Sequence, residues 1–163
     1  MSSSVGLSAT KLLPIAGSWA APFTLYFLTL SSRVAAERLK TKVFIGDTCN
    51  CCNKKDAANQ PHKSRPDPLQ LAIRCHSNFL QTVPLAFVLL TIAELNGGNR
   101  EALTYLMATL FALRVAHADG GMRLRGNFGG GAIGRPLGYI GSMGVLAGLA
   151  GYSTYLVRAY WGF

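Results

Sequence analysis

Long uncharged stretches of mostly apolar residues alternate with short basic ones along the chain. Four of these stretches contain no Asp, Glu, Lys or Arg, at Leu12–Ser32, Cys75–Ala93, Ala102–Leu113 and Pro136–Val157. A helix that crosses a membrane needs about 20 predominantly apolar residues, which the first, second and fourth stretches provide. The third stretch reaches this length only when Arg114 and His117 belong to the same helix.

The pattern predicts an all-α integral membrane protein, a four-transmembrane-helix bundle formed by a single domain over residues 1–163. The helices are expected at about 12–34, 69–95, 102–119 and 135–160. The alternative is a soluble bundle, whose helices would each keep a polar face. Leu85–Ile92, with the sequence LAFVLLTI, has no such face. The first stretch is also too long for the apolar region of a typical cleaved signal peptide.

The basic residues lie almost entirely on one side of the predicted helices. Of the 16 Lys and Arg residues, nine fall in residues 33–74 and four in 114–135, and only three lie elsewhere. By the positive-inside rule, both basic segments are expected in the cytoplasm and both termini on the opposite side. The net charge of +9 therefore indicates topology. It does not indicate nucleic-acid binding, because no basic stripe interleaved with aromatic residues accompanies it.

The segment between the first two predicted helices, residues 46–68, is expected to be a cytoplasmic loop with a cysteine-rich insertion. Cys49, Cys51 and Cys52 cluster there. A reducing compartment disfavours structural disulfides. Cys-x-Cys-Cys lacks the usual ligand spacing of a zinc site, so metal binding together with His62 is the least favoured interpretation and no metal site is predicted. The two favoured interpretations of the cluster are exposed thiols without a dedicated role and palmitoylation sites near the membrane.

Glycine is concentrated in the last part of the chain, with twelve of the 18 glycines between residues 120 and 151. Gly134, Gly141 and Gly148 recur every seven residues, as do Gly144 and Gly151. Small residues on one helix face allow close packing in membranes. The repeat therefore predicts that the fourth helix packs closely against a neighbour, in the same chain or in another.

Each of the last three predicted helices carries a strip of polar residues. Ionisable groups at membrane depth are costly, so they are candidates for function. The alternative for the arginines is that they flank the helices and extend to the membrane surface. Because residues three, four or seven apart share a helix face, the strips can line one pocket, which would suit an anionic polar ligand whose other end lies among lipid tails. The strips are Arg74, Asn78 and Gln81; Arg114 and His117; Arg135 and Tyr139.

These residues resemble motifs of the MAPEG family, the membrane-associated proteins in eicosanoid and glutathione metabolism. The most specific likeness is the second-helix sequence Arg74-Cys-His76-Ser-Asn78-Phe-Leu-Gln81-Thr-Val-Pro84, and the run that follows it, LAFVLLTIAELNGG, is closest to the bacterial-type branch. The third- and fourth-helix motifs of microsomal prostaglandin E synthase are similar to Arg114-Val-Ala-His117 and Arg135-x-x-x-Tyr139. The end of the family's first helix is similar to Arg33-Val with Arg38 and Gly46-Asp47.

The resemblance implies a homotrimer that binds glutathione, as a co-substrate, between subunits in the cytoplasmic half of the bundle. It implies that Arg135 stabilises the glutathione thiolate, with Tyr139 nearby. A thiol with a pKa of about 8.5 needs a cationic neighbour to ionise at neutral pH. Arg123 and Arg125 are alternatives to Arg135, because the loop before it is long and rich in glycine. The implied glutathione-binding residues are Arg38, Arg74, Asn78, Gln81, Arg114 and His117.

The resulting hypothesis is a glutathione-dependent membrane transferase or peroxidase that acts on lipophilic electrophiles or lipid hydroperoxides. Two departures from the family pattern favour an alternative, a non-catalytic protein that binds lipid or glutathione: Gln81 stands where the family usually has Glu, and Gly121 where several members have Tyr. The glycine repeat favours a third, a structural subunit of a membrane assembly. The expected location is the endoplasmic reticulum of a eukaryote, or else the mitochondrial outer membrane or a bacterial inner membrane.

Overall fold

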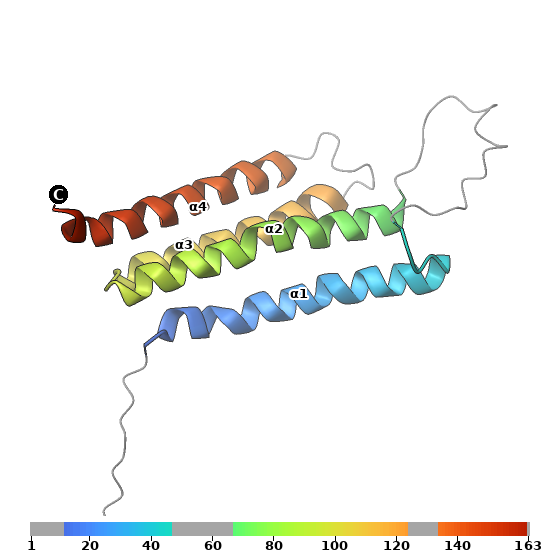
Figure 1. Ribbon diagram of the computed structural model, residues 1–163. Helices are drawn as coiled ribbons and strands as arrows, with labels where there is room; N and C mark the ends of the chain where they lie inside the picture. Colours follow the sequence, from blue (N-terminus) through green and yellow to red (C-terminus); the bar gives the residue numbers. More distant parts are fainter. Residues whose placement is uncertain (1–11, 47–66, 124–133, 163) are drawn as a thin grey trace, which may run out of the picture.

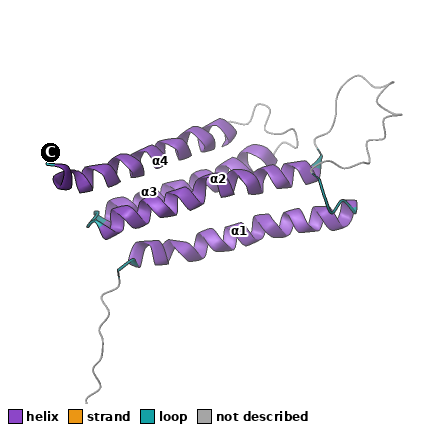
Figure 2. Cartoon of the chain, in the orientation of Figure 1, coloured by secondary structure: helices purple, strands orange, loops and turns teal. Residues whose placement is uncertain are grey.

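All the regular structure in the described part of the chain is helical, as the sequence predicts (Figure 2). The computed structural model describes residues 12–46, 67–123 and 134–162. The long helices are α1 (Pro14–Thr41), α2 (Pro68–Leu95), α3 (Arg100–Val115) and α4 (Gly134–Val157). A π-helix, η1 (Ala116–Arg123), continues α3, and a 3₁₀ turn, η2 (Arg158–Trp161), follows α4. The cysteine cluster and Arg125 lie outside the described residues.

The four helices lie side by side in an up-and-down bundle, with α1 and α4 on opposite sides of α2 and α3 (Figure 1). α1 contacts α2 and α3, whereas α4 contacts α2, α3 and η1. In the described residues the backbone of α1 comes close to neither α4 nor η1. The end of α1, the start of α2, η1 and the start of α4 share one end of the bundle (Figure 1). We name it the basic end, because it carries Arg38, Arg74 and Arg135.

The helix boundaries follow local sequence signals. α1 and α2 each begin with a proline, whose fixed φ suits the first helical turn. The side chains of Asp67 and Asn99 accept hydrogen bonds from backbone N–H groups in the first turns of α2 and α3. α1 continues to Thr41 rather than ending near residue 34, because the basic residues from Arg33 onwards end the apolar stretch without breaking the helix.

Aromatic and aliphatic side chains fill the interior of the bundle. The ring of Phe23 in α1 lies 5.3 Å from that of Phe87 and 5.1 Å from that of Phe111, measured between centroids, and both contacts are edge-to-face. They join α1 to α2 and α3. The larger fully buried apolar side chains farther into the bundle include Leu90, Leu103, Met107, Leu110 and Leu149.

Two parts of the bundle have the length and composition to cross a membrane: α2, and the continuous helix Gly134–Trp161 formed by α4 and η2. α1 is long enough but not apolar enough to meet the same criterion for crossing a membrane, because Ser, Thr, Pro and Gly residues interrupt its apolar sequence. α3 has only 16 residues before the π-helix begins. The two apolar helices support the predicted membrane class, whereas crossing by all four helices stays a prediction.

A carboxylate near each end of α1 ties that helix to the rest of the bundle. At the end opposite the basic end, Glu94 of α2 accepts hydrogen bonds at 2.7 and 3.0 Å from two backbone N–H groups in the first turn of α1. These groups have no partner within the helix itself. Toward the basic end, Asp119 of η1 accepts a hydrogen bond from Arg33 Nη1 at 2.7 Å and one from the Tyr26 hydroxyl at 3.0 Å.

Candidate functional site

A polar pocket opens at the basic end of the bundle, where α2, η1 and α4 meet. It has a volume of about 390 Å³ and is lined by Asn78, His117, Arg135, Pro136 and Tyr139. Four of these five were predicted from the sequence as site residues, and they come from three different helices. The structure therefore brings together a part of the predicted site: one amide, one imidazole, one guanidinium and one phenol.

His117 lies at the centre of this group and is held from two sides. Its Nδ1 is 2.9 Å from the backbone oxygen of Arg135, and its Nε2 is 3.2 Å from Nδ2 of Asn78. A carbonyl oxygen can only accept a hydrogen bond, so Nδ1 carries the proton in this arrangement, and Nε2 accepts from the Asn78 amide. These partners fit a neutral imidazole whose orientation is fixed by α2 and α4 together.

Close contact between η1 and the start of α4 places the Arg135 carbonyl beside His117. Gly138 faces the histidine directly: a Cβ at this position would lie 2.5 Å from His117 Cβ and 2.7 Å from the backbone oxygen of Leu113. A Cβ at Gly134 would lie 3.0 Å from the backbone oxygen of Ala116. A side chain at 138 would force its neighbours to shift and one at 134 would be tightly crowded, so glycine at both positions allows the two backbones to lie in contact.

Arg114 lies beneath the pocket and does not line it. Only 4% of the residue is exposed. Its guanidinium donates hydrogen bonds to the backbone oxygen of Gly138, to Thr82 Oγ1 at 3.2 Å and to the backbone oxygen of Asn78 at 3.4 Å. Arg114 therefore ties α3 to both α2 and α4. Its contact with glutathione stays a prediction.

A comparison with known protein families matches residues 16–155 to the MAPEG family. The chain belongs to the MAPEG family. The match extends from the start of α1 to the end of α4 and confirms the resemblance recognised in the sequence. Membership and the two apolar helices together support a helical membrane protein with a glutathione-related function. No curated protein and no solved structure matches the chain.

The geometry explains one departure of this MAPEG chain from the family pattern. Gly121 stands four residues after His117, where several members have a tyrosine. A Cβ at Gly121 would lie 2.5 Å from the backbone nitrogen of Arg135 and 2.8 Å from its Cα. The start of α4 thus occupies the space that a side chain at this position would need. The phenol in the pocket is that of Tyr139, which is 57% exposed.

The other glutathione-binding residues predicted for this MAPEG chain lie outside the polar pocket. Arg74 and Gln81 are exposed on α2, about one turn to either side of Asn78. Arg38 donates hydrogen bonds at 3.1 and 3.0 Å to two backbone oxygens just beyond the end of α1. A single chain therefore assembles part of the predicted site and leaves three of its members on other surfaces.

Two features of the site were missed by the sequence analysis. His117 lies in a π-helix, η1. This conformation is rare in proteins, and where it occurs it is often found at functional sites. Asp119, also in η1, pairs with Arg33. One signal was available: Asp119 is the last acidic residue in the chain and falls at the end of a predicted membrane helix.

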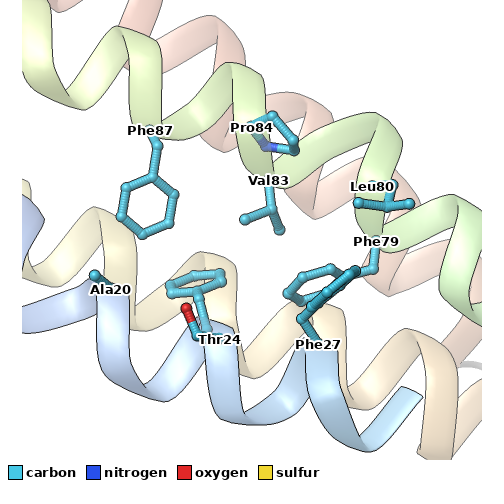
Figure 3. A pocket seen from close by; sticks show the side chains of 9 residues that line it. Ala20, Thr24, Phe27, Phe79, Leu80, Val83, Pro84 and Phe87 are labelled. Atoms are coloured by element: carbon cyan, nitrogen blue, oxygen red, sulfur yellow. The ribbon is translucent and has the colours of Figure 1, made fainter. Parts of the chain in front are cut away.

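A second cavity, of about 360 Å³, lies between α1 and α2 and is almost wholly apolar. Phe27, Phe79, Val83 and Phe87 line it, and the Thr24 hydroxyl is the polar side-chain group among the residues drawn (Figure 3). Such a surface cannot stabilise a charged ligand. This cavity therefore offers no acid–base or anion chemistry, whereas the polar pocket does, as does a groove of about 340 Å³ between α1 and α2 that is lined by Arg33, Glu37 and Lys40.

Proposed function

We propose that the protein is an integral membrane enzyme that activates glutathione and transfers it to lipophilic electrophiles, or uses it to reduce lipid hydroperoxides. The observation that carries the proposal is the convergence of Asn78, His117, Arg135 and Tyr139 on one pocket in a chain of the MAPEG family. Hydrogen bonds to charged groups are stronger than neutral ones, so a guanidinium among these donors favours an anionic ligand.

In this proposal the Arg135 guanidinium stabilises the glutathione sulfur as a thiolate. Lowering a thiol pKa of about 8.5 by about two units makes the anion predominant at neutral pH and takes about 2.7 kcal/mol of preferential stabilisation. A cation at contact distance in a partly desolvated pocket provides an interaction of this order. His117 fixes the Asn78 amide, whose oxygen accepts a peptide N–H of glutathione.

The thiolate then reacts with the lipophilic substrate. With an electrophile, sulfur forms a bond to carbon while the displaced electron pair moves to a leaving group or a conjugated oxygen, which the Tyr139 hydroxyl can protonate. With a hydroperoxide, sulfur forms a bond to the terminal oxygen as the O–O bond breaks, and the departing lipid alkoxide takes a proton from the Tyr139 hydroxyl, which is reprotonated from water, to leave as the alcohol. A second glutathione converts the resulting sulfenic acid to glutathione disulfide and water.

The proposed assembly is a homotrimer of chains that each cross the membrane four times, with the basic end in the cytoplasm. It would place Arg38, Arg74 and Gln81 of one chain near the polar pocket of another. The exposure of Arg74 and Gln81 on the outside of the single bundle supports this arrangement, and Arg38 is half-buried there. The excess of basic residues in the segments at this end supports the orientation.

The test compares two arginines at opposite ends of α4 in purified protein reconstituted with lipid. Arg135→Ala should lower glutathione conjugation about 25-fold at neutral pH, because the thiolate fraction falls from about three quarters to about 3% when the thiol pKa returns from about 6.5 to about 8.5. Arg158→Ala is the matched control, because Arg158 stacks on Tyr155 at 3.7 Å far from the pocket. Both initial rates and the ultraviolet absorbance of the bound thiolate are measured. Equal loss in the two variants, or none in Arg135→Ala, would contradict the proposal.

The second candidate function is glutathione or lipid binding without catalysis. It is favoured by Gly121, which leaves no phenol on η1, and by Gln81 in place of the usual acid. Glutathione binding with no turnover over a broad panel of electrophiles and hydroperoxides would support it, and rapid turnover of any one would exclude it. The third candidate, a structural subunit, requires the protein to copurify in an assembly larger than a homotrimer.

A further inference from the structure

Asp119 lies on the opposite side of η1 from the polar pocket. Two residues apart on a helix, side chains point in nearly opposite directions. Accordingly, His117 contacts Asn78 of α2 and the start of α4, whereas the Asp119 carboxylate contacts Arg33 and Tyr26 of α1. One short helical segment thus carries the pocket on one side and a charged tie on the other.

The tie spans two elements whose backbones do not approach each other. Within the described residues, the backbone of α1 makes no close contact with η1. The long side chains of Arg33 and Tyr26 reach Asp119, and the ion pair is about one third exposed on each side. Ionisable groups at membrane depth are costly unless they are paired and hydrogen-bonded. A carboxylate placed here therefore has a specific role in holding η1.

η1 is a segment that depends on such support. π-helices are rare and usually last for a single turn. Gly120 and Gly121 directly follow Asp119, and glycine favours the helical conformation less than any residue except proline. α4 contacts η1 through Gly134 and Gly138 on one side, so the bonds to Asp119 hold it from the other.

We propose that Asp119 is a positioning residue: its bonds with Arg33 and Tyr26 hold η1 so that His117 stays between Asn78 and the Arg135 carbonyl. This inference deepens the proposed function and rests on it, because it assumes that the pocket binds glutathione. The placement of His117 is nevertheless a property of the protein alone, and it is measured without glutathione.

The experiment compares Asp119→Asn with Glu94→Gln. Each variant neutralises a carboxylate that ties α1 to the bundle, but Glu94 acts at the end away from the pocket. The ring nitrogens of His117 are followed by ¹H–¹⁵N NMR in protein labelled on histidine, with His117→Gln used to assign the signal. Thermal unfolding and the Kd for glutathione are measured on the same samples.

We expect wild-type His117 to show a single Nδ1–H tautomer. Asp119→Asn should lose this single tautomer and bind glutathione about tenfold more weakly, an effect equivalent to one hydrogen bond. Glu94→Gln should lower the unfolding temperature to a similar extent while leaving the His117 signal and the Kd unchanged. Asp119→Glu, which keeps the charge, should recover most of the affinity.

Unchanged His117 signals in Asp119→Asn would overturn the proposal. If Glu94→Gln altered the His117 signals as much as Asp119→Asn does, the proposal would also be overturned, since both changes would then reflect general loosening of the bundle. If Asp119→Asn does not fold, Tyr26→Phe keeps the ion pair and removes one hydrogen bond; the absence of any shift in its His117 signal would also overturn the proposal. A wild-type protein that binds no glutathione would refute the proposed function, and the His117 signals would still decide the role of Asp119.

Discussion

The two halves of α4 use glycine in opposite ways. In the half near the basic end, a Cβ at Gly138 or Gly141 would lie less than 3.0 Å from atoms of α3 or η1. In the other half, Gly144, Gly148 and Gly151 have no atom within 4 Å of the Cβ position in the described structure. The same residue type in one helix therefore permits close backbone contact in one half and leaves an open surface in the other.

The difference shows what close contact contributes to the site. In the closely packed half, backbone oxygens of α4 accept hydrogen bonds from side chains of neighbouring helices. The Gly138 oxygen accepts one from Arg114, and the Arg135 oxygen accepts one from His117. In the open half, α4 is held through buried side chains such as Val145 and Leu149. The open half also makes hydrogen bonds to other helices, but through its own side chains Tyr152 and Ser153. The first arrangement instead uses the α4 backbone to fix polar side chains of its neighbours, and such fixed positions are what a binding pocket requires.

The largest effect is expected for Gly138→Ala. The added Cβ would clash with His117 Cβ and with the Leu113 backbone oxygen. Neither atom can move without shifting η1 or α3. We expect a loss of about 3 kcal/mol of stability, typical of overpacking against backbone, together with loss of glutathione binding. Chemical unfolding in detergent and a glutathione titration measure the two effects. Wild-type stability in this variant would remove the distinction between the two halves of α4.

A smaller effect is expected for Arg114→Met, which keeps the length and apolar stem of the side chain. The change removes the charged hydrogen bonds to Gly138, Thr82 and Asn78, while the Gly138 and Asn78 oxygens keep hydrogen bonds from Ser142 and Thr82. We expect a loss of about 2 kcal/mol in unfolding free energy. The control is Arg158→Met, where the guanidinium lies over the exposed Tyr155 ring and a loss below about 1 kcal/mol is expected. Equal losses in both variants would show that Arg114 does not link the helices.

Much of this arrangement was predictable from the sequence. Uncharged stretches indicated four helices, and the spacing of polar residues on α2, η1 and α4 indicated a shared pocket, because spacing determines which residues share a helix face. The family resemblance supplied the candidate ligand. The extension of α1 to Thr41 was missed, since the end of an apolar stretch marks a change of surroundings and not the end of a helix.

The remainder depends on contacts between helices, which the sequence of one helix does not contain. The seven-residue glycine repeat predicted close packing along α4 but not that it stops after Gly141. Arg114 was predicted to contact glutathione, which stays a prediction, but its hydrogen bonds to Gly138 and Thr82 could not be foreseen, because those oxygens lie across the interface. The π-helix was also missed, since its stability depends on Asp119 meeting α1.

The smallest effect, and the one of opposite sign, is expected for Gly148→Ala. With no atom within 4 Å of the Cβ position, the added methyl group meets nothing in the described chain, and alanine favours a helix over glycine by up to about 1 kcal/mol. We expect a gain of about 0.5 kcal/mol in unfolding free energy with an unchanged oligomeric state, measured by unfolding and by light scattering. A loss of stability together with dissociation would mean that a second chain packs on Gly144, Gly148 and Gly151. The open half would then match the closely packed half, with its backbone contact made between chains, and the glycine repeat would have a single physical cause along the whole helix.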